Sequence, residues 1–202
     1  MIDSDRLDDL KKAAAIIQQG GIILAPTDTV WGLMCNYESA EAVASIFKIK
    51  KSPGKPVAII CDSIENIEKL QVEFSPYIRN IAKNYWPGPL TLIFKSGLNN
   101  IGHIAGNNNS IGVRIPDSEE LRELVRLSGK PLAATSANIT GQKQTREFDD
   151  IPDEITVNAD FICKFDVHPS GVASTVIDCT SEKLKIIREG AISLEKLKKA
   201  MN

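Results

Sequence analysis

Polar side chains gather at several points where apolar runs of this sequence end. The run at 22–24 is followed by Thr27, Asp28 and Thr29. Later polar positions at strand-like ends are Arg114, Thr135, Ser136, Asn138, Ser174, Thr175 and Arg188. Hydroxyl, amide and guanidinium groups suit an anionic or zwitterionic ligand, because a guanidinium can pair with carboxylate or phosphate through two hydrogen bonds. The pattern indicates positioning and electrostatic catalysis, the usual strategy for transfer at phosphorus.

The stretch 25–33 admits two interpretations. Asp and Thr side chains can bond nearby backbone amides, which makes a turn. Alternatively, strand ends in open α/β sheets are places where small molecules bind. Taken singly, the other polar residues also have structural explanations: Arg114 and Arg188 could lie along the surface, and Ser136 and Asn138 could cap a strand end. The local sequence by itself favours the turn.

Several common catalytic motifs do not occur in the sequence. GxxxxGK[ST], a GxGxxG opening a helix and GxSxG are all absent. His103 and His168 lie in loop-like sequence, and nothing pairs either of them with a serine. The cysteines at 35, 61, 163 and 179 form no CxxC pair, so they indicate neither a zinc site nor a disulfide framework. We expect reduced core thiols, and any metal should arrive with a ligand.

Helices and strands alternate along the chain and would position these residues. Periodicity and capping residues, Ser4 among them, predict helices at 5–19, from about 39 to the lysines near 50, and at 63–70, 75–84, 118–128 and 194–201. Apolar runs predict strands at 21–26, 57–61, 90–94, 111–116, 131–137, 174–178 and 184–188, the last two forming a hairpin. The stretches 96–110 and 139–153 are typical of loops. This order predicts one α/β domain over residues 1–202, built on a mixed sheet.

Composition and charge exclude several classes of protein. The chain has 202 residues, 43% hydrophobic and 25% charged, as is usual for a soluble globular protein. The polar N-terminus lacks the apolar segment of a signal peptide, and no run approaches the roughly twenty apolar residues of a membrane span. The net charge of −2 argues against broad non-specific nucleic-acid binding but allows a local basic patch. We expect a cytoplasmic protein.

Five blocks of the sequence resemble one known family. Residues 26–33, PTDTVWGL, are similar to the PTxTxYGL motif of the YrdC-like threonylcarbamoyl-AMP synthases, and residues 86–91 match that family's WPGPLT. Its remaining blocks resemble VRIP at 113–116, ATSAN at 134–138, and STV at 174–176 with REGA at 188–191. The blocks occur in the family's order and cover residues 10–191, so the resemblance is more specific than one short motif.

The resemblance implies a fold and a reaction. The fold is a YrdC-like α/β (α+β) domain in its short form, a twisted mixed sheet with flanking helices around a concave, basic cavity. L-threonine and bicarbonate form an N-carboxylated amino acid, which attacks the α-phosphate of ATP and gives threonylcarbamoyl-AMP and pyrophosphate. Partner threonylcarbamoyl transferase proteins then modify tRNA, so tRNA or double-stranded RNA is an implied partner. Mg²⁺ would be carried with ATP, mainly by phosphates and water.

The resemblance also implies roles for the polar residues. The group that would hold threonine is Thr27, Thr29, Arg114, Thr135 and Ser174, with Arg114 paired to its carboxylate. The group that would face the nucleotide is Lys50, Ser136, Asn138 and Arg188. Lys50 would be catalytic, as a point charge suited to phosphates. No side chain need form a covalent intermediate, and the stretch 25–33 becomes a ligand-binding strand end.

The stretch after Lys50 departs from the family pattern. The family has an arginine two positions after this lysine, whereas here Ser52 stands in that position. Lys51 or Lys55 would then supply the missing charge. The alternative is a divergent YrdC-like module that binds RNA or nucleotide without synthase activity. Pyrophosphate release that needs both threonine and bicarbonate distinguishes the two.

Overall fold

The structure, a computed structural model, describes residues 2–52, 54, 56–181 and 183–201. Its helices are α1 (Ser4–Gln18), α2 (Ala40–Ile49), α3 (Ile64–Glu68), α4 (Pro76–Tyr85), α5 (Glu119–Ser128), α6 (Asp153–Thr156) and α7 (Leu194–Met201), with 3₁₀ turns η1 (Asn107–Asn109) and η2 (Phe148–Asp150). Its strands are β1 (Ile23–Pro26), β2 (Trp31–Asn36), β3 (Ala58–Ile60), β4 (Leu90–Lys95), β5 (Ser110–Arg114), β6 (Leu132–Ser136), β7 (Phe161–Ile162), β8 (Thr175–Asp178) and β9 (Lys185–Arg188). None of the helices in the described part of the chain has the length and apolar character needed to cross a membrane.

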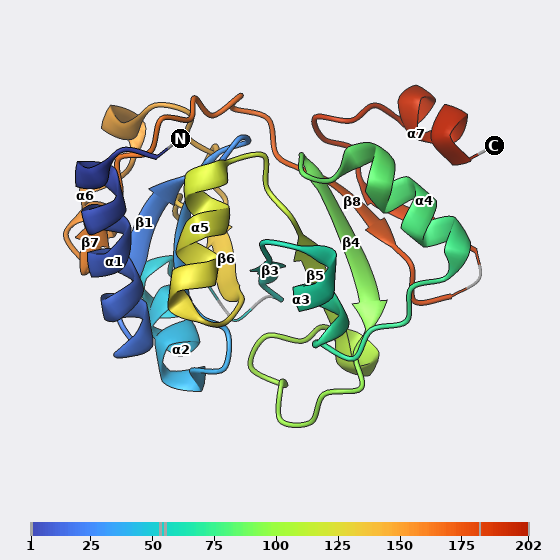
Figure 1. Ribbon diagram of the computed structural model, residues 1–202, viewed down its shortest axis with the longest axis horizontal. Coiled ribbons are helices and arrows are strands. Elements are labelled where there is room, and N and C mark those ends of the chain that lie inside the picture. The colour runs from blue at the N-terminus through green and yellow to red at the C-terminus, as the bar shows by residue number, and fades with distance from the viewer. Residues whose placement is uncertain (1, 53, 55, 182, 202) are drawn as a thin grey trace.

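The strands form one mixed sheet in the order β7-β1-β2-β6-β3-β5-β4-β8-β9 (Figure 1). β1–β2 and the predicted hairpin β8–β9 are antiparallel, whereas β3–β5 and β4–β8 are parallel. The predicted mixed α/β architecture is confirmed. The pairing of β4 with β8 places the segment before Thr175 beside the WPGPLT block, although the two are far apart in the sequence.

Helices cover the two faces of the sheet unevenly. α1 and α5 pack together on one face, where Leu10, Ile17 and Leu121 contact apolar side chains of β1, β2 and β6. α2, α3 and α4 supply side chains such as Ile46 and Ile81 to a larger core on the other face. Each fully buried side chain of this size contributes about 1.5–3 kcal/mol. On the face of α1 and α5, the strands β3, β5, β4 and β8 border a cavity instead.

Local sequence explains where most helices begin and end. Ser39 caps α2 and Ser118 caps α5, each accepting a hydrogen bond from an amide in the first turn. Gly129 ends α5 in the left-handed conformation, which glycine adopts without steric cost. The expectation that Ser4 caps α1 is wrong. Asp3 is the cap instead: the helix begins at Ser4, and the Asp3 carboxylate accepts a hydrogen bond from the backbone amide of Arg6 in the first turn.

Three elements were not expected from the sequence. β2 is buried along almost its whole length, so it lacks the alternation of polar and apolar residues that marks a half-exposed strand. A polar turn precedes it, which masks its beginning. α6 and β7, of four and two residues, are too short to show a periodicity, and α6 begins where a loop was expected to end.

Candidate functional site

The turn between β1 and β2 is held by the hydroxyl of Thr27. Its Oγ1 accepts hydrogen bonds from the amides of Thr29 and Val30, each at 3.1 Å, and donates to the Val30 carbonyl at 2.8 Å. Both threonines are buried, and both line the cavity. The turn interpretation of this stretch is therefore correct as geometry, and it places the same residues at the wall of a cavity.

Thr29 is the threonine of this turn that contacts Arg114. Two amides already donate to Thr27 Oγ1, which itself lies 2.8 Å from the Val30 carbonyl. Thr29 Oγ1 shares a hydrogen bond of 2.9 Å with Thr27 Oγ1 and accepts from Arg114 Nη1 at 2.8 Å. Thr27 therefore fixes the turn, and Thr29 connects the turn to the guanidinium at the cavity wall.

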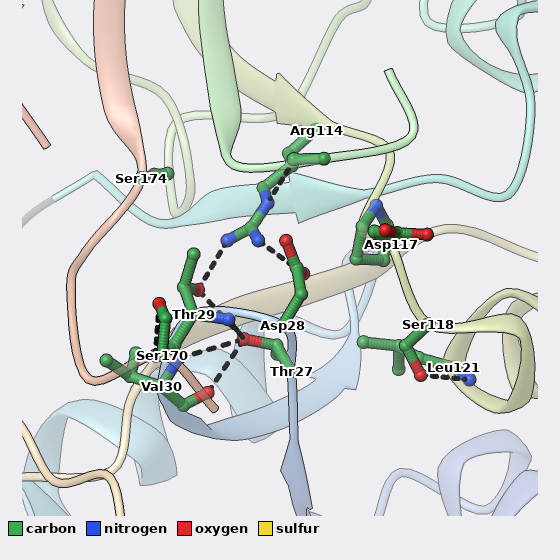
Figure 2. Close-up of polar contacts among 12 residues, drawn as sticks. Thr27, Asp28, Thr29, Val30, Arg114, Asp117, Ser118, Leu121, Ser170 and Ser174 are labelled. Atoms are coloured by element: carbon green, nitrogen blue, oxygen red, sulfur yellow. Dashed lines mark hydrogen bonds and ion pairs between the residues drawn. The ribbon is translucent and has the colours of Figure 1, made fainter. Parts of the chain in front are cut away.

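Arg114, at the end of β5, is held by three acceptors (Figure 2). Nε donates to the Gly88 carbonyl at 3.0 Å, Nη1 donates to Thr29 Oγ1, and Nη2 forms an ion pair with Asp28 Oδ1 at 2.5 Å. Burial lowers the pKa of Arg114, and the nearby Asp28 carboxylate opposes this lowering. Three of the five N–H groups are engaged, so the guanidinium is oriented in advance and two N–H groups remain for a ligand.

Arg188, on β9, brings a second guanidinium to the same cavity. Nε donates to the Ser174 carbonyl at 3.1 Å, and Nη2 donates to Ser174 Oγ at 3.2 Å. Ser174 Oγ lies 2.8 Å from Thr91 Oγ1. Burial and the positive charge of Arg114 both lower the pKa of Arg188. Arg188 is therefore close enough to Arg114 to be affected by its charge, and an anion bound to Arg188 would offset this effect.

The chain turns sharply after Arg188, and the hydroxyl of Thr175 holds this turn. Thr175 Oγ1 donates to the Ile192 carbonyl at 2.7 Å and accepts from the amides of Gly190 and Ile192, each at 3.0 Å. A Cβ on Gly190 would lie 2.2 Å from the Ala173 carbonyl oxygen, so only glycine fits there. These contacts fix the end of β9, and with it Arg188, against the start of β8.

Lys50 is buried at the C-terminal end of α2. Its Nζ donates to the Asn138 carbonyl at 2.6 Å, to Asn138 Oδ1 at 3.2 Å and to the Ser136 carbonyl. Ser136 Oγ in turn donates to Asn138 Oδ1 at 2.5 Å. Burial lowers the pKa of Lys50 to about 8. The three donors of the ammonium match three oxygens, so its charge is held next to the segment that carries Ser136 into the cavity wall.

The cavity has a volume of about 310 Å³, which is in the size range of small-molecule sites. Seven of the nine predicted site residues line it: Thr27, Thr29, Arg114, Thr135, Ser136, Ser174 and Arg188. Lys50 and Asn138 instead lie beside Ser136, through the contacts given above. Ser136 and Asn138 do not lie on one face of a single strand. β6 ends at Ser136, and the chain then turns, so that the backbone N–H of Asn138 donates to the Ser136 carbonyl at 3.0 Å.

Three polar residues that the sequence reasoning did not assign to the site also line the cavity: Thr91, Ser110 and Gln144. Asp28 was named only as part of the polar turn, and the structure shows that it holds Arg114. Thr91 lies in the WPGPLT block and Asp28 in PTDTVWGL, so the motif blocks were the available signal. Gln144 lies in a stretch without periodicity, where nothing in the sequence distinguishes it from its polar neighbours.

Lys51, one of the two lysines expected to replace the family's arginine, is not among the described residues that line the cavity. Lys51 Nζ lies 2.8 Å from Glu154 Oε2, and both side chains are more than half exposed. Lys55, the other residue expected to replace the family's arginine, lies outside the described residues.

We expect Lys51→Gln to leave turnover within about twofold, because an exposed ion pair contributes only about 0–1 kcal/mol. The alternative stated from the sequence, that Lys51 replaces the arginine, requires a loss of roughly tenfold. Steady-state turnover of the two proteins at saturating substrates distinguishes these outcomes. Glu154→Gln removes the other partner of the same ion pair and serves as the control.

The predicted core thiols are buried at Cys35, Cys61 and Cys163, whereas Cys179 is half-buried. Burial raises the pKa of Cys35 to about 12, so this thiol stays protonated and unreactive. Within the described residues, no group of three or more His, Cys, Asp and Glu side chains could hold a metal ion.

Comparisons with known proteins match most of the chain. The Sua5/YciO/YrdC family model, described as telomere recombination, matches residues 15–190. A threonylcarbamoyl-AMP synthase of Pyrococcus abyssi is 33% identical over 95% of this chain and 57% of its own length. A putative threonylcarbamoyl-AMP synthase of Methanocaldococcus jannaschii is 34% identical over 95% of this chain and 88% of its own length.

A solved structure has the same fold. The crystal structure of P. abyssi Sua5 complexed with L-threonine superposes with a TM-score of 0.87 and is 33% identical, covering 95% of this chain and 56% of that one. This chain thus spans little more than half the length of the Pyrococcus protein. Because the family model and a relative of similar length both cover most of the sequence, the chain belongs to the Sua5/YciO/YrdC family.

Proposed function

We propose that this protein is a nucleotidyltransferase that makes threonylcarbamoyl-AMP and pyrophosphate from L-threonine, bicarbonate and ATP. One observation carries the proposal: two guanidinium groups, Arg114 and Arg188, border one cavity together with the hydroxyls of Thr29 and Ser174. The reaction brings together two anionic groups, a carboxylate and a polyphosphate. The names of the relatives, and of the Sua5 complex with L-threonine, support the same reaction.

In this proposal, Arg114 binds the threonine carboxylate with its two remaining N–H groups, and Thr29 lies beside it at the cavity wall. Thr27 and Thr135 shape this end of the cavity, and Ser174, which also holds Arg188, lies where it meets the nucleotide end. The threonine amine condenses with bicarbonate, releasing water and leaving an N-carboxylate. An oxygen of that carboxylate attacks the α-phosphorus of ATP, the bond to the β-phosphate oxygen breaks, and pyrophosphate leaves. Positioning of the reactants accounts for most of the expected rate, as is usual at phosphorus.

The nucleotide end comprises Arg188 and Ser136, supported by Asn138 and Lys50. Arg188 would stabilise charge on the phosphates, and Lys50 would add positive potential from behind Ser136. The described lining residues offer hydroxyl, amide and guanidinium groups rather than carboxylates, which does not fit a magnesium site of the protein's own. Mg²⁺ would therefore enter as part of the ATP substrate. The product would pass to partner threonylcarbamoyl transferase proteins for tRNA modification in the cytoplasm.

Incubation with ATP, labelled bicarbonate and L-threonine tests the proposal. We expect pyrophosphate and a labelled adenylate only when all three substrates are present. L-serine is the matched control substrate, since it lacks one methyl group. The protein should prefer threonine to serine by only about 1 kcal/mol, the free energy of burying that methyl group. Ser52, in the family's arginine position, favours one second candidate, a module that binds nucleotide, tRNA or double-stranded RNA. Binding without turnover would select that candidate and reject the synthase.

A further inference from the structure

The two guanidinium groups of the cavity differ in the charge of their partners. Arg114 is paired with the Asp28 carboxylate at 2.5 Å, and the two side chains are only 7% and 14% exposed. The partners that the structure describes for Arg188 are the carbonyl and hydroxyl oxygens of Ser174, which are neutral. Arg114 and Asp28 therefore form a buried ion pair without net charge, whereas Arg188 has only neutral partners among the described residues and adds a positive charge to the part of the cavity that it borders, which we call the Arg188 end.

Asp28 contacts Arg114 from outside the cavity lining. Thr27 and Thr29, on either side of it in the sequence, line the cavity, whereas Asp28 is not among the described lining residues. The Asp28 carbonyl accepts a hydrogen bond from the Ser170 amide at 3.1 Å, which ties the turn to the loop after β7. Figure 2 shows the Asp28 carboxylate beneath the guanidinium, on the side of the turn. Asp28 therefore acts on a ligand through Arg114.

The charge of the partner decides which anions an arginine attracts. A polyphosphate carries several negative charges, so its attraction to a site depends strongly on the net charge there. A paired arginine loses most of this long-range attraction and repels a second highly charged group through its partner. It keeps its directed N–H groups, which a single carboxylate can still use. Pairing Arg114 thus penalises polyanions more than it penalises a monocarboxylate.

We propose that Asp28 is a specificity-determining residue that reserves the Arg114 end of the cavity for a singly charged carboxylate and directs polyphosphate to Arg188. The identity of the two natural ligands rests on the function proposed above. The difference in charge between the two ends does not, so it can be probed with pyrophosphate alone.

The test compares Asp28→Asn with the wild type. The amide keeps the size of the side chain and an acceptor for Arg114 but removes the charge. By calorimetry, we expect the wild type to bind one pyrophosphate without competition from L-threonine. In Asp28→Asn, pyrophosphate should also occupy the Arg114 end, raising the stoichiometry towards two and weakening threonine binding in its presence by about tenfold or more.

Asp117→Asn is the matched control. This carboxylate also lies near the turn in Figure 2, but it is 73% exposed and pairs with Arg122 at 3.9 Å, so the same change in total charge should leave pyrophosphate binding as in the wild type. One pyrophosphate without competition in Asp28→Asn overturns the proposal. A wild type that binds pyrophosphate but no threonine counts against the proposed function, and the gain in stoichiometry still tests the role of Asp28.

Arg188→Gln keeps the proposal testable if Asp28→Asn does not fold. With Asp28 in place, this variant should lose pyrophosphate binding by about tenfold or more, because the remaining arginine is neutralised. Pyrophosphate that still binds to Arg188→Gln and competes with threonine would show that Arg114 accepts a polyanion despite Asp28. That result would also overturn the proposal.

Discussion

Arg114→Lys is expected to lower kcat/KM for L-threonine by roughly 30- to 1000-fold, or about 2–4 kcal/mol. Lysine keeps the charge, but its single nitrogen cannot serve Gly88, Thr29 and Asp28 together and still offer two parallel donors to a carboxylate. The affinity for ATP should change by less than about threefold, because the nucleotide is assigned to the other end of the cavity. Steady-state kinetics with threonine varied at saturating ATP, together with calorimetry of ATP binding, measure both quantities.

Arg126→Lys is a suitable control for this variant. Arg126 lies on α5, is 39% exposed and pairs with Glu119 and Glu123, away from the cavity. Arg126→Lys should leave kcat/KM for L-threonine and the affinity for ATP unchanged. An equal loss of threonine and ATP binding in Arg114→Lys, in a protein that remains folded by circular dichroism, would contradict the assignment of Arg114 to the carboxylate.

Lys50→Met should reduce turnover by about 100-fold or more, some 2.7 kcal/mol. The substitution removes a buried cation near the proposed nucleotide site, together with the three hydrogen bonds that its ammonium donates to Ser136 and Asn138. The segment that positions Ser136 would then relax. Lys48→Met, an exposed change in the last turn of the same helix, is the control and should be nearly silent. Full turnover in Lys50→Met would reject this role.

The same lysine predicts a pH dependence. Burial lowers the pKa of Lys50 from 10.5 to about 8, so its ammonium is present below about pH 8 and lost above it. We expect kcat/KM of the wild type to fall as the pH rises through 8. Between about pH 8 and 10.5 the unfolded chain binds this proton more tightly than the folded protein, so the free energy of unfolding of the wild type, relative to Lys50→Met, should rise with pH. A flat activity profile from pH 7 to 10 would contradict this expectation.

The helices were largely predictable because their signals are local. Ser39, Ser118 and Gly129 mark ends that the structure reproduces, and apolar residues at helical spacing face the two cores. β2 was not predictable, since a strand buried on both faces next to a polar turn has no period of its own. β2 pairs with β1 across the short polar turn and with β6 from a distant part of the chain, and its central place in the sheet depends on the second pairing.

The members of the site could be predicted better than their contacts. The motif blocks pointed to Arg114, Ser174 and Arg188, and all three line one cavity. The ion pair of Asp28 with Arg114 joins residues that are 86 positions apart and that the order of strands in the sheet brings together. The contact of Arg188 with the neutral Ser174 depends on how the last hairpin folds back. Likewise, the division between Thr27 and Thr29 depends on which lone pairs the backbone occupies, and residue types do not reveal this.

The hydroxyl of Thr175 has a consequence for hydrogen exchange. It holds the amides of Gly190 and Ile192, which lie beyond the end of β9 and would exchange rapidly if that end frayed. Because Thr175 is completely buried, these amide protons should exchange as slowly as those of the central strands. The slowly exchanging region therefore extends past Arg188. Deuterium uptake at these two amides reports whether the segment after β9 unfolds locally beside Arg188.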